Sequence, residues 1–82
     1  MLRVILNRST LEEAMARHNL TRKKLAYAAA LSRSYFSRIM AGKEAPSAAV
    51  RQRLQQIFPE YTFDNLFKIE TEKEEKQKEN PP

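Results

Sequence analysis

Two segments near the ends of the chain alternate between apolar and polar positions. The first is MLRVILN, residues 1–7, which is also rich in β-branched residues, and the second is FKIET, residues 67–71. A period of two is typical of β-strands, so we expect a short strand at each place. These strands are able to pair with each other, although a two-stranded ribbon is marginal alone and needs helices beneath it.

Between these segments, apolar residues recur every three or four positions, which is the period of an α-helix. The first helical stretch follows Ser9 or Thr10, either of which forms a capping box with a glutamate three residues later, and it reaches His18. The single glycine, Gly42, ends the third stretch, and Pro59 ends the fourth. The later stretches are expected to be capped by Thr21, Ser32, Ser47 and, for a last short turn, Thr62.

Together, the expected strands and helices predict one small domain over residues 1–71. After Thr71 the chain reads EKEEKQKENPP, which contains no apolar residue to bury. We therefore expect residues 72–82 to be a disordered charged tail.

The composition excludes most catalytic chemistry. With no cysteine there is no disulfide, thiol nucleophile or zinc-thiolate site, which favours a cytoplasmic protein. The only histidine, His18, is expected to border the core with a carbonyl as its partner, since no second histidine exists to share a metal. No run approaches the roughly 18 apolar residues of a membrane span. We expect no enzyme activity, metal, cofactor or membrane partner.

The charge is distributed unevenly along the chain. Residues 1–69 hold 12 Lys/Arg against 5 Asp/Glu, a net charge of +7, while residues 70–82 hold 3 against 5, a net charge of −2. Between Arg17 and Arg53 there are nine basic residues and a single acid, Glu44. This concentration favours a polyanionic partner. The alternative is an ordinary solvated surface, although such surfaces usually mix both signs.

The expected helix after Ser32 has two faces when its residues are placed about 100° apart. One face is apolar and holds Tyr35, Phe36, Ile39 and Met40. The other has small residues between two arginines and holds Arg33, Ser34, Ser37, Arg38 and Ala41. Small side chains allow close approach, and arginines have the reach and donors to bind guanine edges or phosphates, so this face suits a DNA major groove. A simple polar outer face of an amphipathic helix is the alternative.

The helix after Thr21 begins with Arg22, Lys23 and Lys24. Each cation in a first helical turn costs about 0.3–1 kcal/mol, because the helix macrodipole favours acids there. A docked phosphate would offset that cost and would also accept from the free amides of the helix start. These residues are therefore candidate phosphate ligands.

The segment LTRKKLAYAAALSRSYFSRIMAGKEAPS resembles the Xre or lambda-repressor-like (Cro-type) helix-turn-helix DNA-binding family. The unit corresponds to residues 22–41, with the family's apolar positions filled by Leu25, Ala26, Ala29, Leu31, Phe36 and Ile39. The resemblance implies a compact helix-turn-helix bundle of about five helices. Together with the helical segments above, it leads us to expect an all-α fold to which the two end segments add a small two-stranded ribbon.

The resemblance also assigns roles within this unit. It implies base-reading by Arg33, Ser34 and Arg38 with Ser37 close by, phosphate contacts from Arg22 and Lys43, and backbone amides offered at Thr21 and Ser32. Lys23 joins the phosphate ligands because it lies in the same first turn as Arg22. The family usually has glycine where this chain has Ala30, and a Glu-Asn pair where it has Met40 and Ala41.

These expectations lead us to predict a transcriptional regulator that binds double-stranded DNA in a sequence-specific way. We expect it to repress a phage, plasmid or other mobile-element promoter and to be a homodimer, at least on DNA. The alternative is an antitoxin-type module that neutralises a partner protein and binds DNA secondarily. Tyr61, Phe63 and Phe67 would serve such a partner, although we expect burial against the helices. Single-stranded nucleic acid and RNA are less favoured, because the aromatic residues lie at core spacing.

Overall fold

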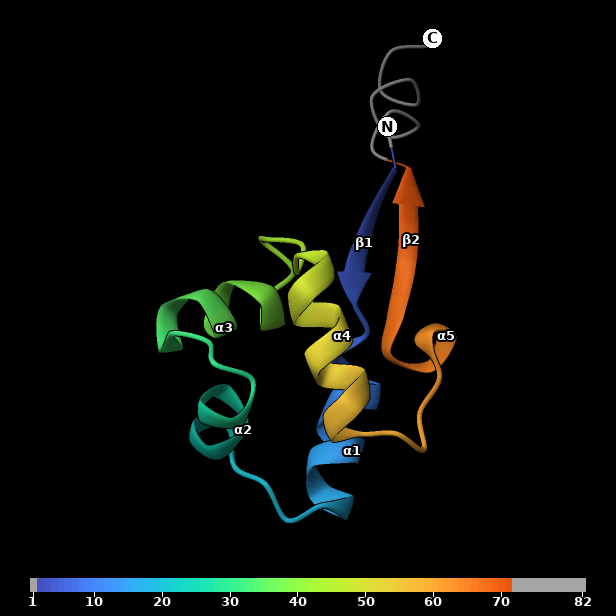
Figure 1. Ribbon diagram of the computed structural model, residues 1–82. Coiled ribbons are helices and arrows are strands. Elements are labelled where there is room, and N and C mark those ends of the chain that lie inside the picture. Colours follow the sequence, from blue (N-terminus) through green and yellow to red (C-terminus); the bar gives the residue numbers. More distant parts are fainter. Residues whose placement is uncertain (1, 72–82) are drawn as a thin grey trace, which may run out of the picture.

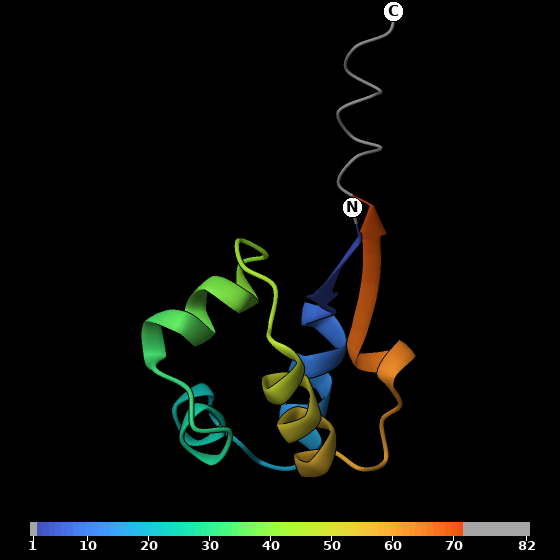
Figure 2. The same cartoon turned by 45° about the horizontal axis from the view of Figure 1, so that its top comes forward.

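A computed structural model describes residues 2–71 of the chain. The elements, in order, are β1 Leu2–Leu6, α1 Arg8–Arg17, α2 Arg22–Ala28, α3 Arg33–Met40, α4 Ala48–Ile57, α5 Phe63–Leu66 and β2 Phe67–Thr71. Helices α2 and α3 lie on one side of the molecule, and β1, β2 and α5 lie on the other (Figures 1 and 2). Residues 72–82, the expected tail, lie outside the described residues. No helix in the described part is long and apolar enough to cross a membrane.

The expected all-α class is wrong, because the two end strands are part of the fold. β1 and β2 pair antiparallel, with Leu2 opposite Thr71 and Leu6 opposite Phe67. Leu6 and Phe67 are only 7% and 1% exposed, so the base of the ribbon belongs to the hydrophobic core. Residues 2–71 therefore form a mixed α/β globule of five helices and a two-stranded sheet. The ribbon that is marginal alone is stabilised by burying one end against the helices.

Four of the predicted helix caps are confirmed. The side chains of Thr21, Ser32, Ser47 and Thr62 each accept a hydrogen bond from a backbone N–H of the first turn. The cap of α1 is not Ser9 or Thr10 but Asn7, whose side-chain oxygen accepts from the Thr10 N–H at 3.3 Å. A helix begins at the residue that follows its N-cap, so α1 begins at Arg8, earlier than predicted.

The first three helices end with the same backbone motif. The residue after each C-cap is left-handed, with φ of 57° at Asn19, 60° at Ala30 and 77° at Gly42. The next N–H bonds back to the carbonyl five residues earlier, which closes a Schellman motif. These bonds are Leu20 to Met15 at 2.9 Å, Leu31 to Ala26 at 2.8 Å and Lys43 to Arg38 at 2.9 Å. Gly42 thus has its predicted role, and Ala30 takes a conformation that disfavours alanine.

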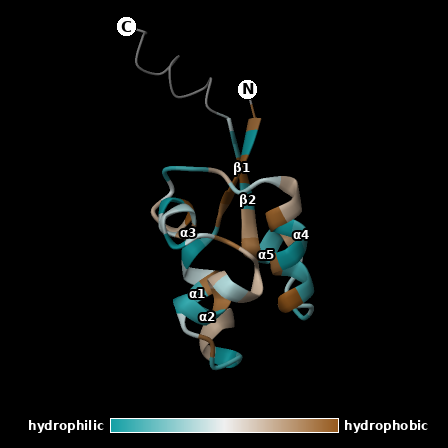
Figure 3. Ribbon diagram, turned by 60° about the vertical axis from the view of Figure 1, so that its left-hand side comes forward, coloured by the Kyte–Doolittle hydropathy of each residue, from teal (hydrophilic) through white to brown (hydrophobic). Residues whose placement is uncertain are grey.

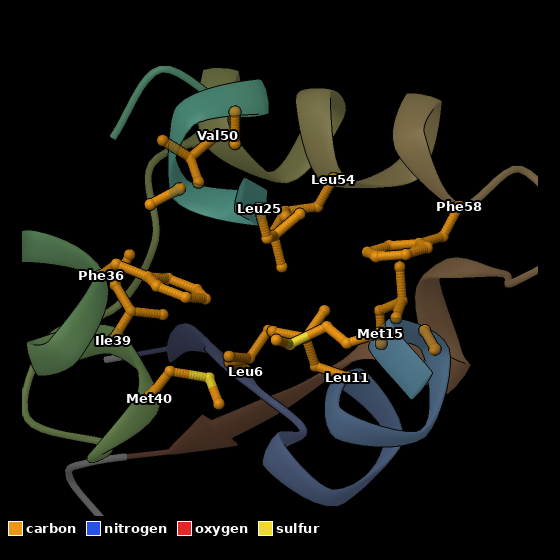
Figure 4. Close-up of a cluster of buried hydrophobic side chains, with 14 of the residues drawn as sticks. Leu6, Leu11, Met15, Leu25, Phe36, Ile39, Met40, Val50, Leu54 and Phe58 are labelled. Atoms are coloured by element: carbon orange, nitrogen blue, oxygen red, sulfur yellow. The ribbon is translucent and has the colours of Figure 1, made fainter. Parts of the chain in front are cut away.

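The core lies between the helices and the base of the ribbon (Figure 4). The side chains that meet there include Leu6 from β1, Leu11 and Met15 from α1, Leu25 from α2, Phe36, Ile39 and Met40 from α3, and Val50 and Leu54 from α4. This packing fixes α3 by its apolar side and leaves its polar side outward.

His18 borders the core, as predicted, but its partner is a carboxylate rather than a carbonyl. Its ring meets the buried ring of Phe58 edge-on, with 4.8 Å between the centroids. Its Nε2 lies 2.6 Å from Oε2 of Glu60. This hydrogen bond lowers the pKa of Glu60 below its ordinary value. The pair joins the end of α1 to the segment that follows α4.

Candidate nucleic-acid interface

The two predicted faces of α3 are confirmed by burial. Phe36, Ile39 and Met40 are buried. The residues on the opposite side are all exposed, namely Arg33, Ser34, Ser37, Arg38 and Ala41. Hydrophilic residues accordingly colour much of α3 in Figure 3. The helix therefore presents small side chains between two arginines to the solvent.

A cleft of about 190 Å³ runs between α2 and α3. Its lining consists of Arg22, Lys23 and Ala26 from α2 and Arg33, Phe36 and Ser37 from α3. Two predicted base-reading residues and two predicted phosphate ligands thus share one concave surface. Ala26 and Phe36 are buried, so they supply apolar walls beneath the cationic rim.

Arg38 lies at the other edge of α3 and is held there by its neighbours. Its Nε donates to Oε1 of Glu44 at 2.7 Å, and its guanidinium lies 5.8 Å from the centre of the Tyr35 ring. The Tyr35 hydroxyl in turn accepts from the Ser47 N–H at 3.3 Å, which anchors the ring to the start of α4. Because Glu44 binds Nε, the two terminal nitrogens of Arg38 stay available for a bidentate contact.

The arginine of the α2 side is also fixed in position. Nη2 of Arg22 lies 3.5 Å from Oε2 of Glu12, and the same carboxylate oxygen accepts from Arg8 Nε at 3.2 Å. By contrast, Arg33 and Lys23 form no ion pair within residues 2–71. Their charges are therefore not neutralised by a described acid, which suits them to an anionic ligand.

The two cap residues contribute backbone geometry rather than hydroxyl groups. Thr21 Oγ1 accepts from the Lys24 N–H at 3.1 Å, and Ser32 Oγ accepts from the Tyr35 N–H at 3.1 Å. Both hydroxyl groups are therefore occupied by hydrogen bonds within the protein. Only the backbone amides near Thr21 and Ser32 remain available for the phosphate contacts expected at these positions.

The remaining predicted residues lie outside the cleft lining. Ser34 is exposed on α3, and Lys43 is exposed directly after the left-handed Gly42. The predicted residues therefore form two groups. A cleft group contains Arg22, Lys23, Arg33 and Ser37, and a second group near the end of α3 contains Arg38 and Lys43.

Three of the nine basic residues between positions 17 and 53 have internal structural roles. Arg17 Nη2 donates to Glu13 at 3.0 Å, which raises the pKa of Arg17. Arg51 donates to the Pro46 carbonyl at 3.1 Å, and Arg53 donates to the Ala29 carbonyl at 3.2 Å. The other six basic residues lie in α2, α3 and the loop after α3, and two of them, Arg22 and Arg38, also form ion pairs.

Sequence reasoning assigned no role to two residues of α2 and of the loop after α3. Tyr27, on α2, is 88% exposed, and its position opposite the apolar face of that helix was a signal for this exposure. Glu44, the partner of Arg38, was signalled by being the one acid among nine cations.

Three observations concern functions other than DNA binding. Phe67 is buried, and Tyr61 and Phe63 pack against the core, so the aromatic surface that an antitoxin-type module required is largely covered. A second cleft, of about 410 Å³, is lined by residues from α1, α5 and the segment between α4 and α5, including Glu13 and Arg17. No group of three or more potential metal ligands exists within residues 2–71.

Comparisons with protein-family models, with curated proteins and with solved structures find no match to this chain.

Proposed function

We propose that this protein is a sequence-specific double-stranded DNA-binding regulator that inserts α3 into the major groove. In this proposal it acts in the cytoplasm, as a helix-turn-helix protein of the lambda-repressor-like type, and represses a phage, plasmid or other mobile-element promoter by occupying its operator. One observation carries the proposal. The cleft between α2 and α3 brings Arg33 and Ser37, facing outward from α3, next to Arg22 and Lys23 at the start of α2.

The arrangement suits the two kinds of contact that duplex recognition needs. Arg33 and Arg38 stand at the two edges of the exposed face of α3, and Ser34 and Ser37 between them are small enough to let the helix enter the groove. A bidentate arginine contact to guanine discriminates by about 1–3 kcal/mol. Cations beside the helix, in contrast, bind phosphates of any sequence and fix the register.

Two copies are needed for operator-level specificity, because one short helix reaches only a few base edges. In a two-fold complex the two α3 helices meet successive major grooves on one side of the duplex. The operator is then an approximate inverted repeat, with half-site centres about 34 Å apart or a multiple of that distance.

The experiment is a selection of bound DNA from a randomised duplex pool, followed by titration of the enriched duplex and of a scrambled one. We expect an inverted repeat to be enriched. Arg33→Ala should reduce the preference for the enriched duplex by about 1–3 kcal/mol, whereas Arg22→Ala should weaken both duplexes alike.

Arg17→Ala is the matched control, since Arg17 is bonded to Glu13 and lines the second cleft. It should leave the preference unchanged. The proposal is wrong if no sequence is enriched, or if Arg17→Ala and Arg33→Ala reduce binding equally.

A further inference from the structure

The second cleft, of about 410 Å³, lies apart from the proposed DNA-binding surface. It is lined by Thr10, Glu13 and Arg17 from α1, by Glu60 and Tyr61 from the segment between α4 and α5, and by Asn65 from α5. None of these residues lines the cleft between α2 and α3. The volume is within the range of about 300–1,000 Å³ that is typical of small-ligand sites.

Most acidic residues lie outside α2, α3 and α4. Of the six acids in residues 2–71, only Glu44 lies between Arg17 and Arg53, among the nine basic residues. The other five belong to α1, α5, β2 and the segment between α4 and α5, namely Glu12, Glu13, Glu60, Asp64 and Glu70. The part of the surface that contains the second cleft therefore attracts cations more than α2 and α3 do.

The charges inside this cleft do not balance. Arg17 is paired with Glu13, since its Nε and Nη2 both donate to Oε2 of that carboxylate, at 3.2 and 3.0 Å. Glu60 lies 2.6 Å from His18, and this hydrogen bond lowers the pKa of Glu60, which keeps its carboxylate ionised at neutral pH. The lining thus holds two carboxylates against one guanidinium, a net charge of −1.

The two carboxylates also have acceptor capacity left. Each is bonded to another side chain through Oε2, and no side chain of residues 2–71 donates to Oε1 of Glu13 or of Glu60. Thr10, three residues before Glu13 on the same side of α1, adds a hydroxyl oxygen. A cation with several N–H groups is therefore able to bond to more than one of these oxygens at once.

Tyr61 supplies an aromatic wall. Its ring meets the buried ring of Phe58 edge-on, with 6.3 Å between the centroids, which limits its movement. A guanidinium group is planar, carries five N–H donors and stacks on aromatic faces, whereas an ammonium group is a compact point charge. A guanidinium thus matches both the oxygens and the ring of this cleft.

We propose that the second cleft binds one guanidinium group, with its N–H groups on Glu13 and Glu60 and its plane against Tyr61. The group is carried by a small molecule or by an arginine side chain of a peptide. An anion is a poorer candidate, because the net charge of the lining is negative and Arg17 already donates twice to Glu13. The inference does not depend on DNA binding, since no residue of this site belongs to the cleft between α2 and α3.

The test is amide NMR of the labelled protein without DNA, at about pH 7.5, where a histidine side chain is ordinarily neutral, during titration with n-butylguanidinium. We expect saturable shift changes at residues 10–17 and 60–65, with a Kd of about 1–10 mM, the range of so small a ligand. The uncharged n-butylurea, which has the same shape, should bind at least about tenfold more weakly, because it leaves the negative charge of the cleft unpaired.

N-acetylargininamide has the same charge as n-butylguanidinium and identifies the source of the group. A similar or higher Kd indicates a free guanidino compound. A Kd at least about tenfold lower indicates an arginine within a peptide, because the amide groups then contribute to binding.

Glu60→Gln keeps the shape of the side chain and removes its charge, so it should weaken the binding of n-butylguanidinium by about fivefold. Tyr61→Leu should weaken it by about threefold, since the aromatic face is lost. Asp64→Asn is the matched control, because it removes a charge from an exposed residue of α5 that is not in the lining, and it should leave the Kd unchanged.

Circular dichroism checks that each variant is folded. The proposal is overturned if no saturable shift occurs, if n-butylurea binds as well as n-butylguanidinium, or if Asp64→Asn weakens binding as much as Glu60→Gln. Since no DNA is present, a failure here is distinguishable from a failure of the proposed function.

Discussion

Replacing Ala30 by glycine should stabilise this protein, although glycine usually destabilises. Ala30 follows the end of α2 and has a φ of 60°, in the left-handed region. The two other helix ends of the same type have asparagine and glycine at this position, with φ of 57° and 77°. Alanine is thus the least suited of the three residues to its conformation.

The magnitude follows from two opposing terms. A left-handed conformation costs an ordinary L-residue about 1–2 kcal/mol, which glycine does not incur. Glycine in turn costs about 0.4–1 kcal/mol through its greater freedom in the unfolded chain. The side chain of Ala30 is exposed, so its removal opens no cavity. The net effect is a gain of about 0.5–1 kcal/mol, or a rise in Tm of about 2–8 °C for a domain of this size.

Thermal unfolding followed by circular dichroism measures this effect, with two reference variants. Ala16→Gly, at an exposed helical position in α1, should lower stability by about 0.5–1 kcal/mol. Gly42→Ala makes the reverse change at a left-handed position where an added Cβ meets nothing within 4 Å. It should also lower the Tm, through backbone strain alone. If the Tm of Ala30→Gly fell as far as that of Ala16→Gly, the left-handed strain at Ala30 would not be a significant cost to stability.

Three further perturbations test separate parts of the structure. Glu44→Gln should raise the affinity for a random duplex, because a negative charge beside the DNA is removed. It should also lower the preference for the selected site by up to about 1 kcal/mol, because Arg38 is held less firmly. Equilibrium titration of both duplexes measures the two effects. At neutral pH the Glu60→Gln variant should be less stable than the unaltered chain, because the lowered pKa of Glu60 means that its carboxylate is stabilised in the folded state. This difference in the free energy of unfolding should disappear as the pH falls from the ordinary glutamate pKa of about 4.3 through the lowered pKa of Glu60. Denaturation at a series of pH values measures it. Phe58→Ala should cost about 3–5 kcal/mol in urea unfolding, since the ring is fully buried against His18.

Features set by neighbouring residues were predictable from the sequence. Thr21, Ser32 and Ser47 act as caps because each bonds to an amide three residues later, and Gly42 ends α3 because glycine tolerates positive φ. The outward face of α3 followed from helical periodicity alone. The cap of α1 was missed because Asn7 was assigned to the preceding strand, although its side chain is as good a cap as serine.

Features set by contacts between different elements were predicted only in part. Pairing of the two end strands and burial of Phe67 were expected, but the periodicity did not show that Leu6 and the base of the ribbon join the core, and this docking changes the fold class from all-α to mixed α/β. The pairing of Arg38 with Glu44 depends on the reversal of the chain at Gly42. Periodicity places a residue on a face but does not say which side chain lies opposite it.

Two-dimensional amide NMR of the labelled protein, during titration with the selected duplex, can show whether α2 and α3 form the DNA-binding surface. We expect the largest shift changes at residues 21–23, 32–38 and 42–44, and we expect Arg33→Ala to reduce the difference between the selected duplex and a scrambled one. Changes centred instead on the cleft of Glu13, Arg17 and Tyr61, or changes that are the same for both duplexes in the unaltered protein, would contradict the assignment of this surface to α2 and α3.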